Sequence, residues 1–264
     1  MDLGLTGHAI VVTGATSGIG RAVASQLAEE GARLLLVARG QDGLDRTRAA
    51  LPGGPHATLA ADASDPDGGA AIAAACRDAH GRIDGLVLAA GATRDAPPED
   101  LTPEDWELQW RLNVLGPHGL LLAAQDDLAA APGGGRVVLI SSSSGKRPSA
   151  SNMAYSVGKA AQLSLSRAWA QQLAPRGVRV NAVAPGPIDS EMWLADGGLA
   201  DQAAARRGTT REEALDGSRS RVPLGRFGTP EEIADVVVLL ASPRAGFATG
   251  GAWSADGGSV ATIV

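Results

Sequence analysis

The chain has 264 residues, of which 44% are hydrophobic and 20% are charged, and its formal net charge is −6. This is the composition of a globular protein with a sizeable core, and an acidic chain without a basic block is poorly suited to bind nucleic acid or an anionic membrane surface. Cys76 is the only cysteine, which excludes an intrachain disulfide. No signal-peptide pattern and no apolar run of the roughly 20 residues that span a bilayer are present, so we expect a cytoplasmic protein.

Short aliphatic runs recur along the chain, and each has the length of one β-strand. Their nearly continuous apolar character is typical of parallel strands that helices cover on both faces. The expected strands are His8–Val12, Arg33–Ala38, His56–Ala61, Gly85–Ala90, Arg136–Ser141, Val178–Ala184 and Ala252–Ala255. With helix-like segments between them, they predict an α/β fold, a doubly wound parallel sheet of about seven strands with ligands at the carboxyl ends.

Capping residues mark several helices between these strands. The segment Ile19–Glu30 has apolar residues four positions apart and stops at Gly31, which suits the position after a helix end. Thr102 and Thr229 each precede a proline and are followed three residues later by an acid, the arrangement of a capping box. Two further helices are therefore expected to begin there.

No internal repeat or flexible linker divides the sequence, so we expect one domain over residues 1–264. The most polar stretch, Ala195–Arg221, is interpreted as a long excursion from the sheet that forms a lid. Its arginines are interpreted as a solvated face.

The glycine-rich segment Thr13–Gly20 follows the first expected strand and opens the first expected helix. Glycines in this position let the backbone approach the pyrophosphate of a dinucleotide, whose charge faces the helix N-terminus. A tight turn that binds nothing is the alternative for this G-x-x-x-G-x-G spacing. The residues expected to hold a cofactor here are Gly14, Thr16, Ser17, Gly18, Ile19 and Gly20.

Arg39 follows the second expected strand, near the place where an acidic residue binds the ribose in NAD sites. A guanidinium there can bind a 2′-phosphate, which a carboxylate would repel. Arg39 therefore favours NADP(H) over NAD(H). The alternative is that Arg39 only ends the strand in solvent, since the glycine loop offers no second positive charge.

Tyr155, the only tyrosine, and Lys159 are four residues apart in Met153–Ala170, a proline-free segment that is expected to be helical, so they share one face. A tyrosine ordinarily has a pKa of about 10, and an adjacent ammonium together with a positively charged nicotinamide would lower it toward the range of an acid/base catalyst. The serines of Ser141–Ser144 follow a strand, and one hydroxyl can bind a substrate oxygen beside the tyrosine. The alternative is a chance spacing in which the tyrosine is packed in the core.

With Thr13–Gly20, Ser142, Tyr155 and Lys159 in this order, the chain resembles the short-chain dehydrogenases/reductases over essentially its whole length, and is most similar in pattern to the 3-oxoacyl-thioester reductases. The resemblance implies a single-domain Rossmann fold. It also implies that Tyr155 protonates a carbonyl oxygen as hydride arrives, that Lys159 lowers the tyrosine pKa and holds the nicotinamide ribose, and that Ser142 orients the substrate.

The same resemblance implies further site residues. Asn113 would hold a water in a proton relay to the lysine, although an amide that caps a helix kink is the alternative. Additional cofactor contacts are implied at Asp62, Ala63, Ala90, Gly91, Pro185, Gly186, Ile188 and Ser190, and no metal is expected. The segment Leu88-Ala89-Ala90-Gly91 departs from the family's Asn-Asn-Ala-Gly.

Together these residues predict an NADP(H)-dependent oxidoreductase that interconverts a ketone and a secondary alcohol. The alternatives are a cofactor-binding protein without turnover and a relative that uses the same site for non-redox proton transfer or elimination. The expected partner is a small carbonyl or alcohol substrate, whose pocket residues 191–224 would shape. The family further implies a homotetramer or homodimer that buries the apolar end Val260–Val264.

Overall fold

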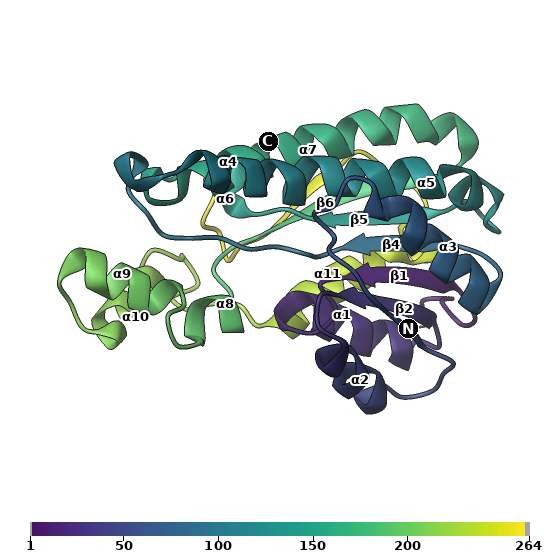
Figure 1. The fold of residues 1–264 in the computed structure, drawn as a ribbon, viewed down its shortest axis with the longest axis horizontal. Coiled ribbons are helices and arrows are strands. Elements are labelled where there is room, and N and C mark those ends of the chain that lie inside the picture. The colour runs from purple at the N-terminus through teal and green to yellow at the C-terminus, as the bar shows by residue number, and fades with distance from the viewer. Residues whose placement is uncertain (1, 262–264) are drawn as a thin grey trace.

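The computed structural model describes residues 2–261, and within them a seven-stranded parallel sheet has the order β3-β2-β1-β4-β5-β6-β7 (Figure 1). The strands are β1 (Ala9–Thr13), β2 (Arg33–Ala38), β3 (Ala57–Ala60), β4 (Gly85–Leu88), β5 (Arg136–Ile140), β6 (Arg179–Pro185) and β7 (Ala252–Ala255). Each overlaps a strand expected from the sequence, so the prediction of a doubly wound α/β sheet is confirmed. The order reverses between β1 and β4, where such sheets bind ligands.

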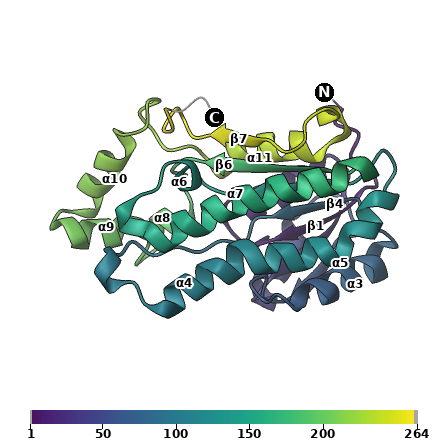
Figure 2. The same ribbon diagram turned by 90° about the horizontal axis from the view of Figure 1, so that it is seen from above.

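Helices cover both faces of this sheet (Figures 1 and 2). On one face lie α3 (Gly68–His80), α5 (Gly116–Ala130) and α7 (Met153–Leu173); on the other lie α1 (Gly18–Glu29), α2 (Gln41–Ala50) and α11 (Pro230–Ala241). Neighbouring strand residues alternate between the two cores: Ile10 and Val12 pack toward α1 and α11, whereas Ala9 and Val11 pack toward α3 and α5. Both faces are buried, which explains the nearly continuous apolar strands.

The expected helix caps are present. Gly31, just after α1, adopts a left-handed φ of 81°, and Thr102 and Thr229 each form a capping box at the starts of α4 (Pro103–Trp110) and α11. A π-helical segment, Arg111–Leu115, joins α4 directly to α5. The remaining short elements are α6 (Ser143–Lys146) and the 3-10 turns Pro98–Asp100, Ala150–Asn152, Ala174–Arg176 and Pro243–Ala245.

The polar excursion forms three helices, α8 (Glu191–Leu194), α9 (Leu199–Arg207) and α10 (Arg211–Arg219), which extend beyond the body of the fold (Figures 1 and 2). Ala203, Ala204 and Ala214 form a small core between α9 and α10. An ion pair of 2.9 Å between Arg206 and Asp95 attaches α9 to the loop after β4. In residues 2–261, no helix combines the length and the apolar character required to cross a bilayer.

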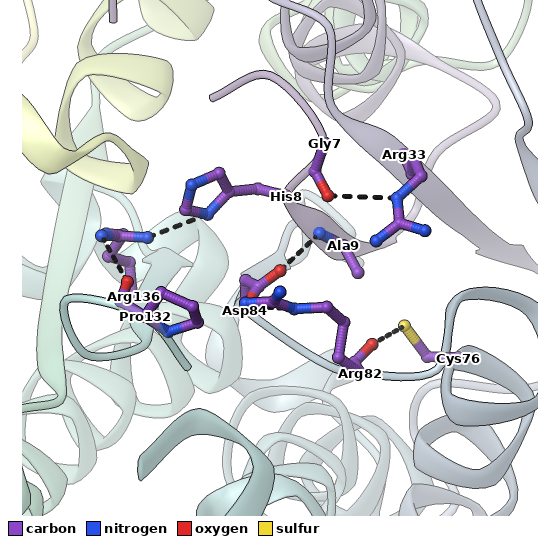
Figure 3. Close-up of polar contacts among 9 residues, drawn as sticks. All are labelled: Gly7, His8, Ala9, Arg33, Cys76, Arg82, Asp84, Pro132 and Arg136. Atoms are coloured by element: carbon purple, nitrogen blue, oxygen red, sulfur yellow. Dashed lines mark hydrogen bonds and ion pairs between the residues drawn. The ribbon is translucent and has the colours of Figure 1, made fainter. Parts of the chain in front are cut away.

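A buried polar cluster lies at the amino-terminal edge of the sheet (Figure 3). Asp84 is 1% exposed; one of its carboxylate oxygens accepts the Ala9 N–H at 2.8 Å and the other accepts Arg82 Nε at 2.9 Å. Arg136 is 3% exposed, and its guanidinium Nη1 is 3.1 Å from Nδ1 of His8. Burial, followed by the charge of Arg136, lowers the pKa of His8, so Nδ1 of the neutral ring accepts this hydrogen bond.

Candidate active site

The carboxyl ends of β1, β4, β5 and β6 surround a cavity of about 230 Å³. It brings together segments that are far apart in the sequence, including the glycine loop, the serine cluster and the start of α7. The predicted site residues that line it are Gly14, Ser17, Gly18, Ile19, Gly20, Gly91, Ser142, Tyr155, Lys159, Pro185, Gly186, Ile188 and Ser190.

The glycine loop has the geometry of an anion cradle. Gly14 has a φ of 67°, and a Cβ on Gly20 would stand 2.2 Å from the Gly14 carbonyl oxygen, so both positions require glycine. Ser17 precedes α1 without capping it through its side chain. The Gly18 N–H at the helix start donates instead to the Glu191 carboxylate at 3.0 Å. A loop that already holds an anionic group at this N–H fits the pyrophosphate of a dinucleotide.

Thr13 fixes the end of β4 against this loop. Its buried hydroxyl accepts the N–H groups of Ala89 at 3.1 Å and of Ala90 at 3.3 Å. These bonds hold the strand end although the segment lacks the family's asparagines. A Cβ on Gly14 would stand 2.9 Å from the Ala89 backbone, so the two loops approach closely.

The serine cluster is held directly against α7. The Ser141 hydroxyl donates to the Lys159 carbonyl at 3.0 Å, and a Cβ on Gly145 would stand 2.9 Å from the Lys159 backbone. The Ser142 hydroxyl accepts the Ser144 N–H at 3.1 Å, and it lies close enough to the Tyr155 phenol to favour the ionised form of that group. Two oxygen-bearing groups that can bind one substrate oxygen are thereby placed side by side at the cavity wall.

Lys159 is buried beneath the tyrosine. Its ammonium donates to the Ile140 carbonyl at 2.7 Å and to Gln162 Oε1 at 3.1 Å, and Nζ lies 5.7 Å from the centre of the Tyr155 ring. Burial lowers the pKa of Lys159 to about 7. The lysine therefore titrates near neutral pH, and its hydrogen bonds point to backbone and amide oxygens.

The pKa of Tyr155 in the protein alone is set mainly by burial. In the protein alone, burial raises this pKa above its ordinary value, and hydrogen bonding from Ser142 opposes the rise without cancelling it. The lowered pKa was expected from the ammonium and a positively charged nicotinamide together, so for the cofactor-bound enzyme it stays a prediction.

Asn113 does not line the cavity. It is fully buried in the π-helical segment, where its amide nitrogen donates to the Gln109 carbonyl and to Gln109 Oε1, both at 2.9 Å. These bonds fit the alternative of an amide that stabilises a helix irregularity. Its Oδ1 has no hydrogen-bond partner among the described residues, which leaves an acceptor for the water of the proposed relay.

Other predicted residues lie along the same sheet edge but outside the cavity. Arg39 is exposed after β2, and Asp62 follows the neighbouring β3; the Ser64 N–H, and to a smaller extent the Arg39 charge, lower the pKa of Asp62. Thr16 lies beside Gly43 of α2. Ala63 and Ala90 line a separate, smaller crevice.

The structure adds two polar cavity residues that were not expected from the sequence, Thr93 and Asn152. The apolar cavity residues Met192 and Leu199 belong to residues 191–224, which were expected to shape the pocket. The Thr93 hydroxyl is buried and unpartnered within residues 2–261. Gln162, the partner of Lys159, lies three positions further along α7, so helical spacing was the available signal.

Comparison with known proteins agrees with this geometry. A family model described as "Enoyl-(Acyl carrier protein) reductase" matches residues 14–260. The chain is 34% identical to a 3-oxoacyl-(acyl-carrier-protein) reductase of Thermotoga maritima, over 97% of this chain and 99% of that one. It is 35% identical to D-threitol dehydrogenase of Mycolicibacterium smegmatis, over 97% and 94% of the two chains.

Among solved structures, L-sorbose reductase from Gluconobacter frateurii, complexed with NADPH and L-sorbose, superposes with a TM-score of 0.92 at 31% identity and covers 100% of both chains. Levodione reductase superposes with a TM-score of 0.90 at 30% identity, covering 98% of this chain and 100% of that one. The sequence motifs, the strand order and these relatives agree, and the chain belongs to the short-chain dehydrogenase/reductase family of oxidoreductases.

Proposed function

We propose that this enzyme reduces a ketone to a secondary alcohol with NADPH, or runs the reverse reaction with NADP⁺. The observation that carries the proposal is the placement of Ser142, Tyr155 and Lys159 on the wall of the cavity that the glycine loop also lines. The test is stoichiometric loss of NADPH absorbance when the protein meets a ketone, with one alcohol formed per NADPH oxidised.

Each residue of this group has a role in the proposed mechanism. The nicotinamide, when bound, supplies the hydride to the carbonyl carbon. Ser142 donates a hydrogen bond to the carbonyl oxygen, and Tyr155 transfers its phenolic proton to that oxygen as negative charge develops there. Lys159 lies beneath the tyrosine and stabilises the phenolate that remains. Asn113 is proposed to hold the water through which that proton is replaced.

The positions outside the cavity fit the adenosine end of the cofactor. We propose that Arg39 binds the 2′-phosphate and that Asp62 lies beside the adenine, because both end adjacent strands at the edge that continues from the glycine loop. The charge of Arg39 supports NADP(H) over NAD(H), since an exposed guanidinium there attracts a phosphate dianion. The relative that is complexed with NADPH gives the same indication.

Replacing Arg39 with Ala is expected to weaken NADPH binding by about 10- to 100-fold, the value of one lost charge-assisted contact. Binding of NADH, which has no 2′-phosphate, is expected to stay unchanged. Titration calorimetry with both cofactors measures the two affinities. Arg46→Ala, an exposed arginine of α2, is the matched control. An equal loss of affinity for both cofactors would mean that Arg39 does not read the phosphate.

We propose that residues 1–264 work as one catalytic domain with residues 191–224 as its lid. The cavity wall combines polar groups, at Thr93, Ser144 and Asn152, with the apolar side chains of Met192 and Trp193. Relatives of this chain include a reductase of oxoacyl thioesters, a polyol dehydrogenase and a ketose reductase. A substrate panel should therefore include a 3-oxoacyl thioester and a ketose with NADPH, and a polyol with NADP⁺.

We also propose a homotetramer or homodimer. Large apolar side chains are exposed along α4, α5 and α7, where Trp106, Trp110, Leu122 and Val157 are 39 to 53% exposed. Large exposed apolar side chains on helices that pack against one another are typical of association surfaces. Sedimentation velocity is expected to show a dimer or tetramer, and Leu122→Asp to shift it to smaller species; a wild-type monomer would contradict the proposal. Of the apolar end Val260–Val264, residues 262–264 lie outside the described residues.

A further inference from the structure

The side chain of Glu191 links the lid to the glycine loop. Glu191 is the first residue of α8, and its carboxylate reaches the end of the glycine loop where α1 begins. One oxygen accepts the Gly18 N–H at 3.0 Å, and the other accepts the Arg21 guanidinium at 2.9 Å. Gly18 and Arg21 both belong to the first turn of α1, so the carboxylate lies on the N-terminus of that helix.

This position is the one that the cofactor diphosphate requires in the proposed function. The N-terminus of a helix carries partial positive charge, and its free N–H groups bind anions. The Gly18 N–H cannot serve a carboxylate and a phosphate oxygen together, and two anions in contact repel each other. Although burial opposes ionisation, the hydrogen bonds and the Arg21 charge keep the pKa of Glu191 below its ordinary value. Glu191 is therefore an anion at neutral pH.

We propose that the carboxylate of Glu191 occupies the diphosphate site of the glycine loop and is displaced when the cofactor binds. The inference rests on the proposed function, because it takes a dinucleotide as the ligand of the loop. Met192 and Trp193 follow Glu191 directly and line the substrate cavity. When the cofactor displaces Glu191, the neighbouring residues Met192 and Trp193 in the cavity wall are affected as well. The competition between Glu191 and the diphosphate also lowers the affinity for the cofactor.

The test compares two ligands that both carry the 2′-phosphate, of which only one carries the diphosphate. NADPH carries the diphosphate and the 2′-phosphate, whereas adenosine 2′-monophosphate carries only the latter. Glu191→Gln keeps the size of the side chain and removes its charge. By titration calorimetry we expect this variant to bind NADPH about tenfold more tightly, which corresponds to about 1.4 kcal/mol. Its affinity for adenosine 2′-monophosphate should equal that of the unaltered protein.

Two further variants support the comparison. Glu212→Gln removes the charge of an exposed glutamate in the same lid and is expected to change neither affinity. Glu191→Ala removes the carboxylate without leaving an acceptor and is expected to tighten NADPH binding as the Gln variant does. Thermal unfolding of each variant shows whether its lid and body remain folded.

Each outcome decides between the claims. Unchanged or weaker NADPH binding in Glu191→Gln, with normal NADPH binding by the unaltered protein, overturns the inference and leaves the proposed function standing. An equal gain of affinity for both ligands also overturns the inference, because the loss of one negative charge would then favour any anionic ligand and not the diphosphate in particular. If the unaltered protein binds neither ligand, the proposed function fails as well.

Discussion

Tyr155→Phe is expected to lower kcat/KM for ketone reduction by about 10²- to 10⁴-fold, the range for loss of a general acid. The affinity for NADPH should stay nearly unchanged, because the substitution removes one hydroxyl and keeps the ring. Steady-state rates with NADPH and a reactive ketone, together with titration calorimetry of NADPH, separate these two quantities. Ser142→Ala is also expected to reduce the rate, although this variant still contains Tyr155 as the proton donor.

The single tyrosine allows a direct test of the proton donor. Spectrophotometric titration of tyrosinate reports Tyr155 alone, with Tyr155→Phe as the blank. Since burial raises the pKa of Tyr155 in the protein alone, we expect ionisation above the ordinary value of about 10 without cofactor. Saturation with NADP⁺ adds positive charge and should lower that pKa. A pKa that does not move with bound NADP⁺, or a Phe variant with full activity, would contradict the acid/base role.

The sheet and the Ser142, Tyr155 and Lys159 group could be predicted because their signals are local. The strands are short apolar runs, and a spacing of four residues on α7 places tyrosine and lysine on one face. The helices α8, α9 and α10 were not predicted, because they are held by small alanine contacts and by ion pairs such as Arg206 with Asp95. Contacts of this kind produce no periodic pattern of apolar residues in the sequence.

Other features depend on contacts between distant segments. The bond from the Gly18 N–H to Glu191 joins residues 173 positions apart, and those from Ala89 and Ala90 to Thr13 join residues 76 and 77 apart. Such pairings follow from the strand order and not from any local pattern. The raised pKa of Tyr155 in the protein alone could not be predicted for the same reason, since spacing shows that Lys159 is near but not how strongly burial acts on the two side chains.

Asp84→Ala is expected to lower the free energy of unfolding by about 2–4 kcal/mol, the cost of breaking a buried charged network. The substitution leaves the Ala9 N–H without its acceptor and removes the nearby acid whose charge offsets the burial of Arg136. Arg136 also pairs in register with Arg179 on the neighbouring strand, and the Arg179 charge opposes its own, so without Asp84 the positive charge of Arg136 would remain uncompensated. Urea denaturation followed by circular dichroism measures the change.

Asp78→Ala is the matched control, because Asp78 is an exposed acid of α3, and its loss is expected to change stability by no more than about 0.5 kcal/mol. Asp84 lies at the amino-terminal edge of the sheet and the cavity at the carboxyl edge, so NADPH affinity should be unchanged in the folded variant. A stability loss equal to that of the control would mean that Arg82 and Arg136 are hydrated well enough to need no buried acid. Loss of NADPH affinity in a folded Asp84 variant would instead show that the two edges of the sheet are coupled.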